Sequence, residues 1–418
     1  MKNRFKSLLV VVAFSAMACG SKSTSDPGSE THWVGIGPDR DDTQDATAPQ
    51  SVSQESPRDS GDTPQHEGSP DVDFLDASDR DAQPENFFEC AEGVGLPEIG
   101  PTMPPPAGPD VTRDLSEGAT TITDAVDLSI GYDHACAVHR SGRVSCWGSN
   151  RFGQLGNGSF DDAEQPVEVT GIDDAVHVVC GHGLTCVLRS TGTVACSGDN
   201  GEHSTGFGDE GFYSTLVPVC ELHAVDQLVS DGSYYMCAIH DHQVNCWGYY
   251  DGLVAVATGM DDVVSVGLSG SVACVVRADG SVSCWGIGAT GYLNDPPDEP
   301  RIVDGISDAI ALGEYAHCAL HDSGSVSCTY SFFATHVVAD LDDAIALSID
   351  SPCAIRSNGK VACWEASSIS LDPDPGRVAI DVPDVENAIA VSGNCAVLAD
   401  GQITCWDVST DGGVHSQN

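Results

Sequence analysis

The sequence predicts an all-β protein, a seven-bladed β-propeller of antiparallel four-stranded blades preceded by a disordered acidic tether. A pattern of cysteine, short apolar run, turn and second cysteine occurs seven times between residues 136 and 405. The first cysteines of successive copies lie 50, 51, 37, 44, 35 and 42 residues apart, a loose period near 43. Each copy contains three short alternating runs separated by glycine-bearing turns, which is typical of consecutive antiparallel strands.

A unit of roughly 40–45 residues repeated seven times fits the four-stranded blades of a propeller. A solenoid is the alternative, but its end repeats should differ from the others as caps. The last copy instead stops soon after its third strand, as expected of a ring. We therefore predict a propeller over residues 111–410 and a C-terminal tail over 411–418.

Hairpin geometry predicts that the paired cysteines form disulfides. The three-residue loop 140–142 places Cys136 opposite Cys146 at a non-hydrogen-bonded site, where α-carbons are about 4.5 Å apart. The third copy is one residue shorter, and a two-residue loop at 241–242 keeps its cysteines opposite each other. The predicted disulfides are Cys136–Cys146, Cys186–Cys196, Cys237–Cys246, Cys274–Cys284, Cys318–Cys328, Cys353–Cys363 and Cys395–Cys405.

Zinc is the alternative explanation for cysteine pairs that lie near His134 or His317. Structural zinc sites, however, usually bring cysteines together at two- to four-residue separations. The intervening residues here are strand-like, and the histidines recur irregularly. We therefore expect no metal and no cofactor.

One copy carries residues that are diagnostic of a family. The run HACAVHRSGRVSCWGSNRFGQLGNG, at 134–158, resembles the repeat of the regulator of chromosome condensation family, and most closely its bacterial, cysteine-bearing secreted or lipoprotein branch. The diagnostic part is WG-x-N-x-x-GQLG-x-G at 147–158, and weaker echoes extend to Trp406. The resemblance implies a seven-bladed propeller that is often closed by a strand from the N-terminal side. The segment around 111–130 is then the expected closing strand.

The N-terminus predicts export. Three basic residues precede an apolar stretch, 8–18, that is too short to span a membrane as a helix. The stretch ends in Ala-Met-Ala-Cys-Gly, which resembles a bacterial lipoprotein signal, so we predict a signal peptide over 1–18 and lipidation of Cys19. Such a protein is anchored in the bacterial cell envelope, at the outer membrane or cell surface. Plain secretion is the alternative, and disulfides persist in both locations.

The segment 19–110 is predicted to be a disordered acidic, proline-rich tether. Residues 20–110 contain 20 acidic and 4 basic residues, a composition that cannot bury enough apolar surface to fold alone. The aspartate-rich run 71–81 lacks the glycine and glutamate of a hand-type calcium loop. The segment 86–97, NFFECAEGVGLP, is an exception, because its two aromatic residues and cysteine suggest that it docks on the propeller.

Three further cysteines, Cys90, Cys180 and Cys220, lie outside the seven pairs. An odd number cannot all pair within one chain. Cys180 and Cys220 are candidates for an extra disulfide between neighbouring blades. Cys90 is then free or joined to another molecule.

Charge restricts the partners of the propeller. Residues 111–418 carry 43 acidic and 10 basic residues, a net charge of −33. This excludes nucleic acid, which requires clustered lysine and arginine, and anionic lipid at the propeller face, so membrane contact is expected only through the lipid anchor. A basic protein, a cation or a sugar is compatible. Adaptation to a saline medium is the alternative reason for the acidic surface.

No enzyme is predicted. The chain contains no Gly-x-Ser-x-Gly, Walker loop, HExxH or dinucleotide fingerprint. The run ADGSVSCW at 278–285 also lacks the spacing of a sialidase box. We therefore assign no catalytic residue.

A binding face is expected on the loops, where the copies differ and aromatic side chains gather. The preferred residues are Tyr249, Tyr250, Tyr234, Tyr235 and Phe152. Packing between blades is the alternative for any one of them. The favoured function is a surface-anchored, disulfide-stapled extracellular binding module for an envelope protein or a glycan. The alternatives are a secreted enzyme inhibitor of the β-lactamase-inhibitory propeller type and a guanine-nucleotide exchange factor, the latter disfavoured by export.

Overall fold

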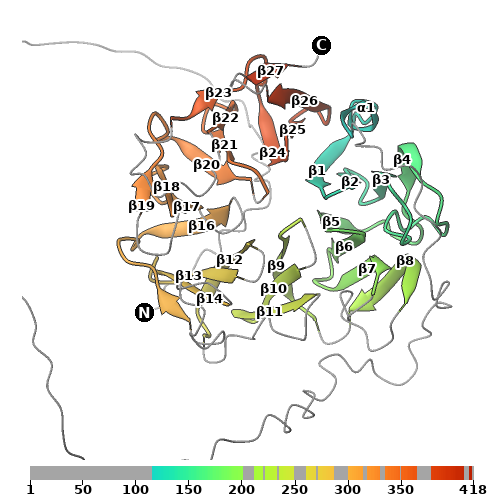
Figure 1. Cartoon of the computed structure of the whole chain (residues 1–418), viewed down its shortest axis with the longest axis horizontal. Coiled ribbons are helices and arrows are strands. Elements are labelled where there is room, and N and C mark those ends of the chain that lie inside the picture. Colours follow the sequence, from blue (N-terminus) through green and yellow to red (C-terminus); the bar gives the residue numbers. More distant parts are fainter. Residues whose placement is uncertain are drawn as a thin grey trace, which may run out of the picture. The chain divides into compact units, whose positions relative to one another are not determined.

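The predicted propeller is confirmed. The computed structural model describes residues 115–200, 211–219, 222–232, 235–248, 260–269, 272–286, 300–313, 318–329, 335–348, 350–364, 378–408 and 414–416. These residues form seven antiparallel sheets arranged in a ring, with the first strand of each sheet innermost (Figure 1). Six sheets have four strands, and the third has three within the described part of the chain.

The strands follow one another around the ring in sequence order. The first three blades contain β1 (Ala125–Ile130), β2 (His134–His139), β3 (Val144–Gly148), β4 (Ala163–Glu168); β5 (Ala175–Cys180), β6 (Leu184–Arg189), β7 (Val194–Asp199), β8 (Phe212–Val219); β9 (Val225–Ser230), β10 (Tyr235–His240) and β11 (Gln243–Gly248). The fourth and fifth contain β12 (Val263–Ser269), β13 (Val272–Arg277), β14 (Val282–Gly286), β15 (Arg301–Ile302); β16 (Ala309–Gly313), β17 (Cys318–His321), β18 (Val326–Thr329) and β19 (Thr335–Val337). The last two contain β20 (Ala344–Leu347), β21 (Cys353–Arg356), β22 (Val361–Cys363), β23 (Ile380–Asp381); β24 (Ala388–Ser392), β25 (Cys395–Leu398), β26 (Ile403–Val408) and β27 (Val414–Ser416).

The predicted hairpin register is confirmed in both loop lengths. Cys136 pairs directly with Cys146, and the loop between them contains Gly142 at φ 81°, a left-handed conformation that glycine adopts without strain. The shortened third hairpin turns through Asp241 and His242 at φ 50° and 61°, as a two-residue type I′ turn requires. All seven predicted disulfides are formed, each with its α-carbons 4.0–4.1 Å apart.

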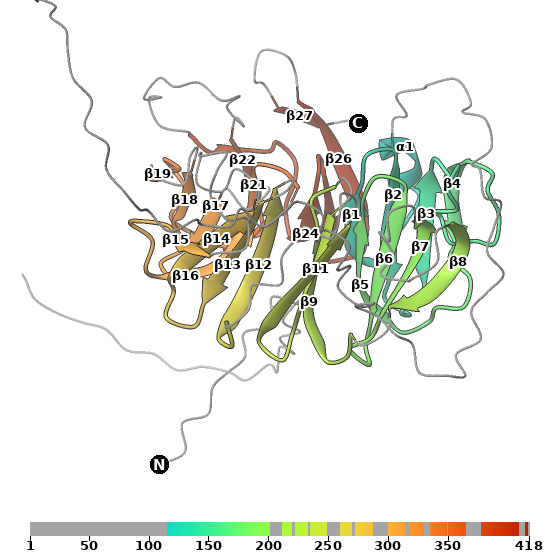
Figure 2. The same ribbon diagram turned by 60° about the horizontal axis from the view of Figure 1, so that its bottom comes forward.

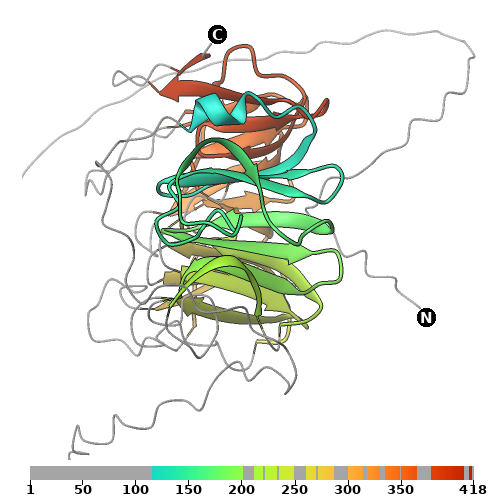
Figure 3. The ribbon, with the colours of Figure 1, turned by 90° about the vertical axis from the view of Figure 1, so that its right-hand side faces the viewer.

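The hydrophobic core lies between neighbouring blades rather than within one. One buried cluster joins Cys237 and Val244 of the third blade to Val266, Val275 and Trp285 of the fourth. Equivalent clusters occupy the other interfaces, and the tryptophans that follow three of the second cysteines, at positions 147, 285 and 406, are fully buried in them. Each sheet therefore contributes side chains to two clusters, one on each of its faces. The strands run between the two faces of the ring (Figure 2 and Figure 3).

Side chains of the innermost strands bond to the backbone of the next blade. The Asp127 carboxylate accepts a hydrogen bond from Val178 N at 3.0 Å. Side-chain oxygens of inner strands make the same contact at other interfaces, where Gln227 accepts from Val266 N at 3.0 Å and Ser265 from Leu312 N at 3.3 Å. An innermost strand is the edge of its sheet, and its N–H groups that point away from the second strand have no strand partner. The neighbouring side chain supplies that missing acceptor.

The expectation of a closing strand from 111–130 is wrong. Residues 125–130 form β1, the innermost strand of the first blade, because they pair with the adjacent β2 in an ordinary hairpin. The fourth strand of the last blade is β27, so the segment 411–418, expected to be a tail, contributes a strand that pairs with β26.

The ring is closed instead by side-chain packing and hydrogen bonds between the last and first blades. Ala125 N donates to Gly401 O at 2.9 Å, and Ile130 N donates to Ser392 Oγ at 2.9 Å. A short helix, α1 (Ser116–Ala119), contacts β4 and β26 across this junction (Figure 1). Trp147 Nε1 donates to the carbonyl of Leu115 at 2.7 Å, which fixes the helix to the first blade.

The predicted signal peptide 1–18, Cys19, the tether 19–110, the docking segment 86–97 and Cys90 lie outside the described residues. Within the described ranges, no helix has the length and hydropathy needed to cross a membrane.

His177 shows how charge reinforces the contact between inner strands. Its Nδ1 lies 2.7 Å from Asp127 Oδ2, and its Nε2 lies 3.1 Å from the carbonyl of Leu228 on the third blade. Burial opposes the charged imidazolium, but the carboxylate of Asp127 and the two hydrogen bonds outweigh it and raise the pKa of His177 above its usual value. The residue thus links three successive blades.

We expect the variant His177→Gln to lower the melting temperature more at pH 6 than at pH 9. A histidine whose pKa is higher in the folded chain stabilises fully below its unfolded value of about 6.5. That contribution is lost as the pH rises through the folded value. Thermal unfolding of the oxidised protein at both pH values measures the difference.

The control is Asp127→Asn, which removes the charge and keeps an oxygen that can accept from Val178 N. In a double-mutant cycle, the coupling between the two substitutions should be larger at pH 6 than at pH 9. A His177→Gln effect that is the same at both pH values would contradict the charged pair.

Candidate functional site

An asparagine-centred network fixes the long loop that follows β3. The Asn150 side chain is fully buried and donates to the carbonyls of Ser159 and Asp161, both at 3.0 Å. Its Oδ1 accepts from Leu155 N at 2.9 Å. Leu155 is fully buried and packs into the core between the first two blades, so the loop is part of the scaffold.

An aromatic group, which we call the rim, gathers from three loops and one strand on the same face of the first two blades. Tyr132 follows β1 and is 75% exposed, and its ring centroid lies 4.9 Å from that of His182, which follows β5. Phe152, in the loop after β3, lies 5.4 Å from Phe212 at the start of β8, and the guanidinium of Arg151 lies 5.4 Å above the Phe152 ring. Tyr132 is the exposed member of these five residues, the other four are half-buried, and Arg151 adds a positive charge.

A glycine allows the rim to assemble. A Cβ atom at Gly183 would lie 2.5 Å from Cδ2 of Phe152, closer than real contacts allow, and the φ of 71° there is one that glycine adopts readily. The glycine therefore lets the Phe152 ring approach the backbone of the second blade.

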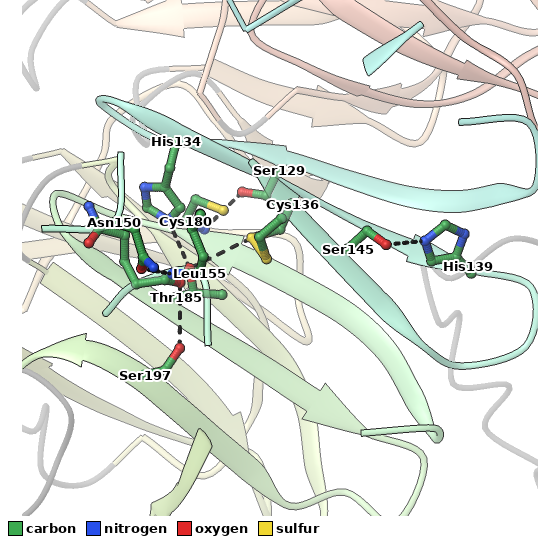
Figure 4. Close-up of a disulfide and its surroundings, with 12 residues drawn as sticks. Ser129, His134, Cys136, His139, Ser145, Asn150, Leu155, Cys180, Thr185 and Ser197 are labelled. Atoms are coloured by element: carbon green, nitrogen blue, oxygen red, sulfur yellow. Dashed lines mark hydrogen bonds between the residues drawn. A yellow bond between two sulfur atoms is a disulfide. The ribbon is translucent and has the colours of Figure 1, made fainter. Parts of the chain in front are cut away.

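Below the rim lies a buried polar cluster, which we call the seam, formed by His134, Cys136, Cys180 and Thr185 (Figure 4). His134 Nε2 is 2.7 Å from Thr185 Oγ1, and Cys136 Sγ is 3.7 Å from the same hydroxyl. One ring nitrogen of His134 and the sulfur atoms of Cys136 and Cys180 all lie within 4.8 Å of one another. Each of the four side chains is almost fully inaccessible to solvent.

The seam and the rim are electrostatically linked through Asp133. Its Oδ1 lies 3.5 Å from His134 Nδ1. Burial favours the neutral acid, but His134, Ser149 and His182 outweigh it and lower the pKa of Asp133. For His134, burial opposes protonation, but the sulfur of Cys180 and the carboxylate of Asp133 prevail and raise its pKa to about 9.

The three groups that lie closest together include a histidine and two cysteines, residue types that bind zinc. Cys136 is already joined to Cys146 in a disulfide, so its sulfur offers no thiolate. Only His134 and Cys180 retain free ligand atoms in the oxidised seam, fewer than a structural zinc site requires.

The expected bridge between Cys180 and Cys220 is not formed. Cys180 is a free, buried thiol. It ends β5, the innermost strand of its sheet, whereas Val219, the residue before Cys220, ends the outermost strand, β8. Three strands' width therefore separates Cys180 from the end of β8, and Cys220 itself lies outside the described residues.

The aromatic residues predicted to bind a partner have different positions. Phe152 is in the rim. Tyr235 is half-buried and packs against the hydrophobic cluster between the third and fourth blades. Tyr234, Tyr249 and Tyr250 lie outside the described residues.

Sequence reasoning missed Tyr132 and His182. Each follows a glycine that comes directly after the innermost strand, at Gly131-Tyr132 and Gly181-His182, so the two occupy the same loop position in neighbouring repeats. The third repeat has Gly232 there. Alignment of the repeats on the end of the innermost strand would have shown a position whose residue changes from copy to copy.

Two hydrogen-bonded chains have the residue types of a serine-hydrolase triad. They are Asp124–His139–Ser145, with distances of 2.6 and 2.7 Å, and Asp308–His321–Ser327, with distances of 2.6 and 2.6 Å. In the second, fourth and sixth blades an arginine takes the place of this histidine and pairs with an aspartate. These pairs are Arg189–Asp174, Arg277–Asp262 and Arg356–Asp343.

This recurrence favours a structural role for both chains. Arginine keeps its proton at physiological pH and cannot act as a general base, so the feature that these five blades share is a hydrogen bond from a nitrogen-bearing side chain to an aspartate, which ties the start of the first strand to the end of the second. Ser327 is also buried, which leaves a substrate no access to its hydroxyl. We therefore interpret these pairs as contacts that stabilise the first hairpin of each of these blades.

Comparison with known proteins agrees with the repeat predicted from the sequence. Residues 141–188 match the regulator of chromosome condensation (RCC1) repeat, and residues 125–154 match a second model of that repeat. None of the curated proteins matches the chain in sequence.

Solved structures of low sequence identity are also similar to the chain. Prp20p of Saccharomyces cerevisiae, studied for its binding to Gsp1p and histones, has a TM-score of 0.49 at 14% identity, covering 66% of this chain and 80% of that protein. Human WBSCR16 has a TM-score of 0.47 at 16% identity, covering 65% and 85%. PorZ, a surface component of the type-IX secretion system of Porphyromonas gingivalis, has a TM-score of 0.45 at 11% identity, covering 71% and 38%.

We expect Asn150→Ala to lower the free energy of unfolding by about 2–3 kcal/mol, because it leaves the buried Leu155 N without its acceptor and removes the donor to the carbonyls of Ser159 and Asp161. Denaturant unfolding of the oxidised protein measures this cost, and hydrogen exchange at Leu155 N should accelerate. The matched control is Asn358→Ala, since Asn358 also accepts a backbone hydrogen bond, from Lys360 N, but in an exposed turn. Equal costs for the two variants would contradict the proposed role of Asn150.

Proposed function

We propose that this chain, whose first two blades carry repeats of the regulator of chromosome condensation family, is a non-catalytic binding module. In this proposal it holds a protein of the cell envelope or exterior on the rim of those two blades. The observation that supports it most is Tyr132, which is 75% exposed and lies beside the half-buried rings of the rim. Aromatic side chains together with arginine are the residues that contribute most to protein–protein affinity.

The rim is held in place before any partner binds. Its loops are held by the Asn150 network, by buried Leu155 and by the close contact of Phe152 with Gly183. The strands beneath carry the Cys136–Cys146 and Cys186–Cys196 disulfides. A surface that is already ordered loses less conformational entropy on binding, which favours affinity.

The charge distribution supports a protein partner of a particular kind. Around the rim, Arg151 and His182 stand in a propeller whose residues 111–418 have a net charge of −33. A partner with an acidic or aromatic side chain for Arg151 and a basic surround would match both features. Glycans also stack on aromatic rings, so glycan binding is an outcome that the experiment must distinguish.

Export and anchoring are part of the same proposal. Seven disulfides are typical of a protein that folds in an oxidising compartment. With Cys19 lipidated, the acidic segment 19–110 would act as a tether between the membrane and the propeller.

The test of rim binding compares the full-length oxidised protein with Tyr132→Ser and Phe152→Ala. Each form is immobilised and exposed to solubilised envelope proteins of the producing organism and to a panel of immobilised glycans. A protein retained by the wild type should bind each rim variant at least roughly tenfold more weakly.

Ile302→Ser is the matched control, because Ile302 is 66% exposed on an outer strand of the fourth blade. It should leave retention unchanged. A partner that binds all four forms equally, or glycan binding with no protein retained, would contradict the proposal.

Anchoring is tested by growing cells that express the full-length chain with a labelled fatty acid. The wild type should incorporate the label and fractionate with membranes. Cys19→Ala should remove both properties, because it removes the thiol that would be acylated. Label that persists in Cys19→Ala would contradict lipidation at this residue.

A further inference from the structure

The thiol of Cys180 has no part in the function proposed above. It is 1% exposed, belongs to the second blade, and packs in the same hydrophobic cluster as Cys136 and Cys146 of the first. Its sulfur and that of Cys136 lie within 4.8 Å of each other. A free thiol therefore faces an intact disulfide across the interface of two blades.

The strand registers explain this juxtaposition. Ser129 pairs with Cys136 within the first blade, and Ser129 Oγ accepts a hydrogen bond from Cys180 N at 2.9 Å. In the second blade Cys180 pairs with Thr185, whose hydroxyl reaches Cys136 Sγ. Backbone pairing and two side-chain contacts thus hold the two sulfur atoms on either side of one interface.

The arrangement is special to this interface among the described blades. The strand position of Cys180 is taken by Ile130, Ser230 and Leu268 in the first, third and fourth blades. The position of His134 is taken by Leu184, Tyr235 and Val272 in the second, third and fourth. Those positions carry no thiol or imidazole, and among the described residues only the seam combines a thiol, an imidazole and a disulfide.

We propose that Cys180 attacks the first-blade disulfide in an intramolecular thiol–disulfide exchange. The Cys180 thiolate attacks Cys136 Sγ, the Cys136–Cys146 bond breaks, and a Cys136–Cys180 bond forms. Cys146 leaves as a thiolate and receives the proton that Cys180 gave up. One disulfide and one thiol are present before and after, so no external oxidant or reductant takes part.

His134 is positioned to handle the proton. The thiolate is the nucleophile in such reactions, and His134 has a ring nitrogen within 4.8 Å of Cys180 Sγ. The Cys180 sulfur and Asp133 raise the pKa of His134, so a thiolate at Cys180 and a protonated His134 stabilise each other. Asp133, with its Oδ1 3.5 Å from His134 Nδ1, stabilises the imidazolium that results.

The product differs from the starting state in what it joins. Cys136–Cys146 links two strands of one blade, whereas Cys136–Cys180 links the first blade to the second beneath the rim. The exchange moves a covalent bond from within a sheet to an interface that otherwise depends on packing and hydrogen bonds. This inference does not depend on partner binding at the rim.

The first test maps the thiol in the full-length oxidised protein. Samples incubated at pH 8 are quenched with acid, unfolded in acidic denaturant with a maleimide, digested without reduction and analysed by mass spectrometry. A Cys136–Cys180 peptide and label on Cys146 should appear with time at pH 8 and stop at pH 4. His134→Gln should slow their appearance by roughly tenfold or more, and Cys180→Ser should abolish them.

A second variant keeps the proposal testable if the exchanged form is scarce. In Cys146→Ser, Cys136 and Cys180 are both thiols in the seam, and a mild oxidant should join them. The matched control is Cys246→Ser, which leaves Cys237 as a thiol that shares its cluster with Leu268 of the next blade and should form no bond across that interface. Cys136 that remains a thiol in oxidised, folded Cys146→Ser would overturn the proposal, as would wild-type label confined to Cys180 at every time.

Discussion

The propeller depends on how the open edge of each innermost strand is satisfied. Such an edge presents N–H groups that no neighbouring strand accepts, and an unpaired buried N–H costs about 1–3 kcal/mol. Here oxygens of Asp127, Ser129, Gln227, Ser265 and Ser392 accept these hydrogen bonds from the next blade. The contacts join the inner strand of one sheet to the inner strand of the next. The apolar clusters between blades, and through them the ring, follow from that placement.

The disulfides have a complementary role, because each acts inside a blade and none crosses an interface. Each closes a loop of nine or ten residues, which contributes about 2–3 kcal/mol in the chain-entropy model. They hold the second and third strands together while the side-chain acceptors hold blade to blade. Loops on such a frame can change in sequence without loss of the fold, so a binding surface can develop on one pair of blades while others keep only their packing residues.

Local features of this fold were predictable from the sequence, and features that join distant repeats were not. The cysteine register followed from counting residues in a loop, since Gly142 marks the left-handed position and the deletion at Asp241-His242 preserves the facing pair. The expectation of a closing strand was wrong because it followed the usual arrangement of the family rather than the pairing of neighbouring strands. The fourth strand of the last blade, β27, is only three residues long and gives little signal in the sequence. The seam was not predicted because His134 and Cys180 meet through packing of two blades, a contact that residue spacing within a repeat does not encode.

Within the described residues, no strand is exchanged between the last and first blades, and the strands of each blade follow one another along the chain. Fourteen cysteines allow on the order of 10⁵ pairings, yet every native partner lies nine or ten residues away. A chain that enters an oxidising compartment from its N-terminus can therefore complete each hairpin and its disulfide before the next cysteine emerges. Order of arrival favours these partners, while Cys180, which emerges just before Cys186, is excluded by the hairpin register that places Cys186 opposite Cys196. Assembly of the ring then waits for the last blade to meet the first.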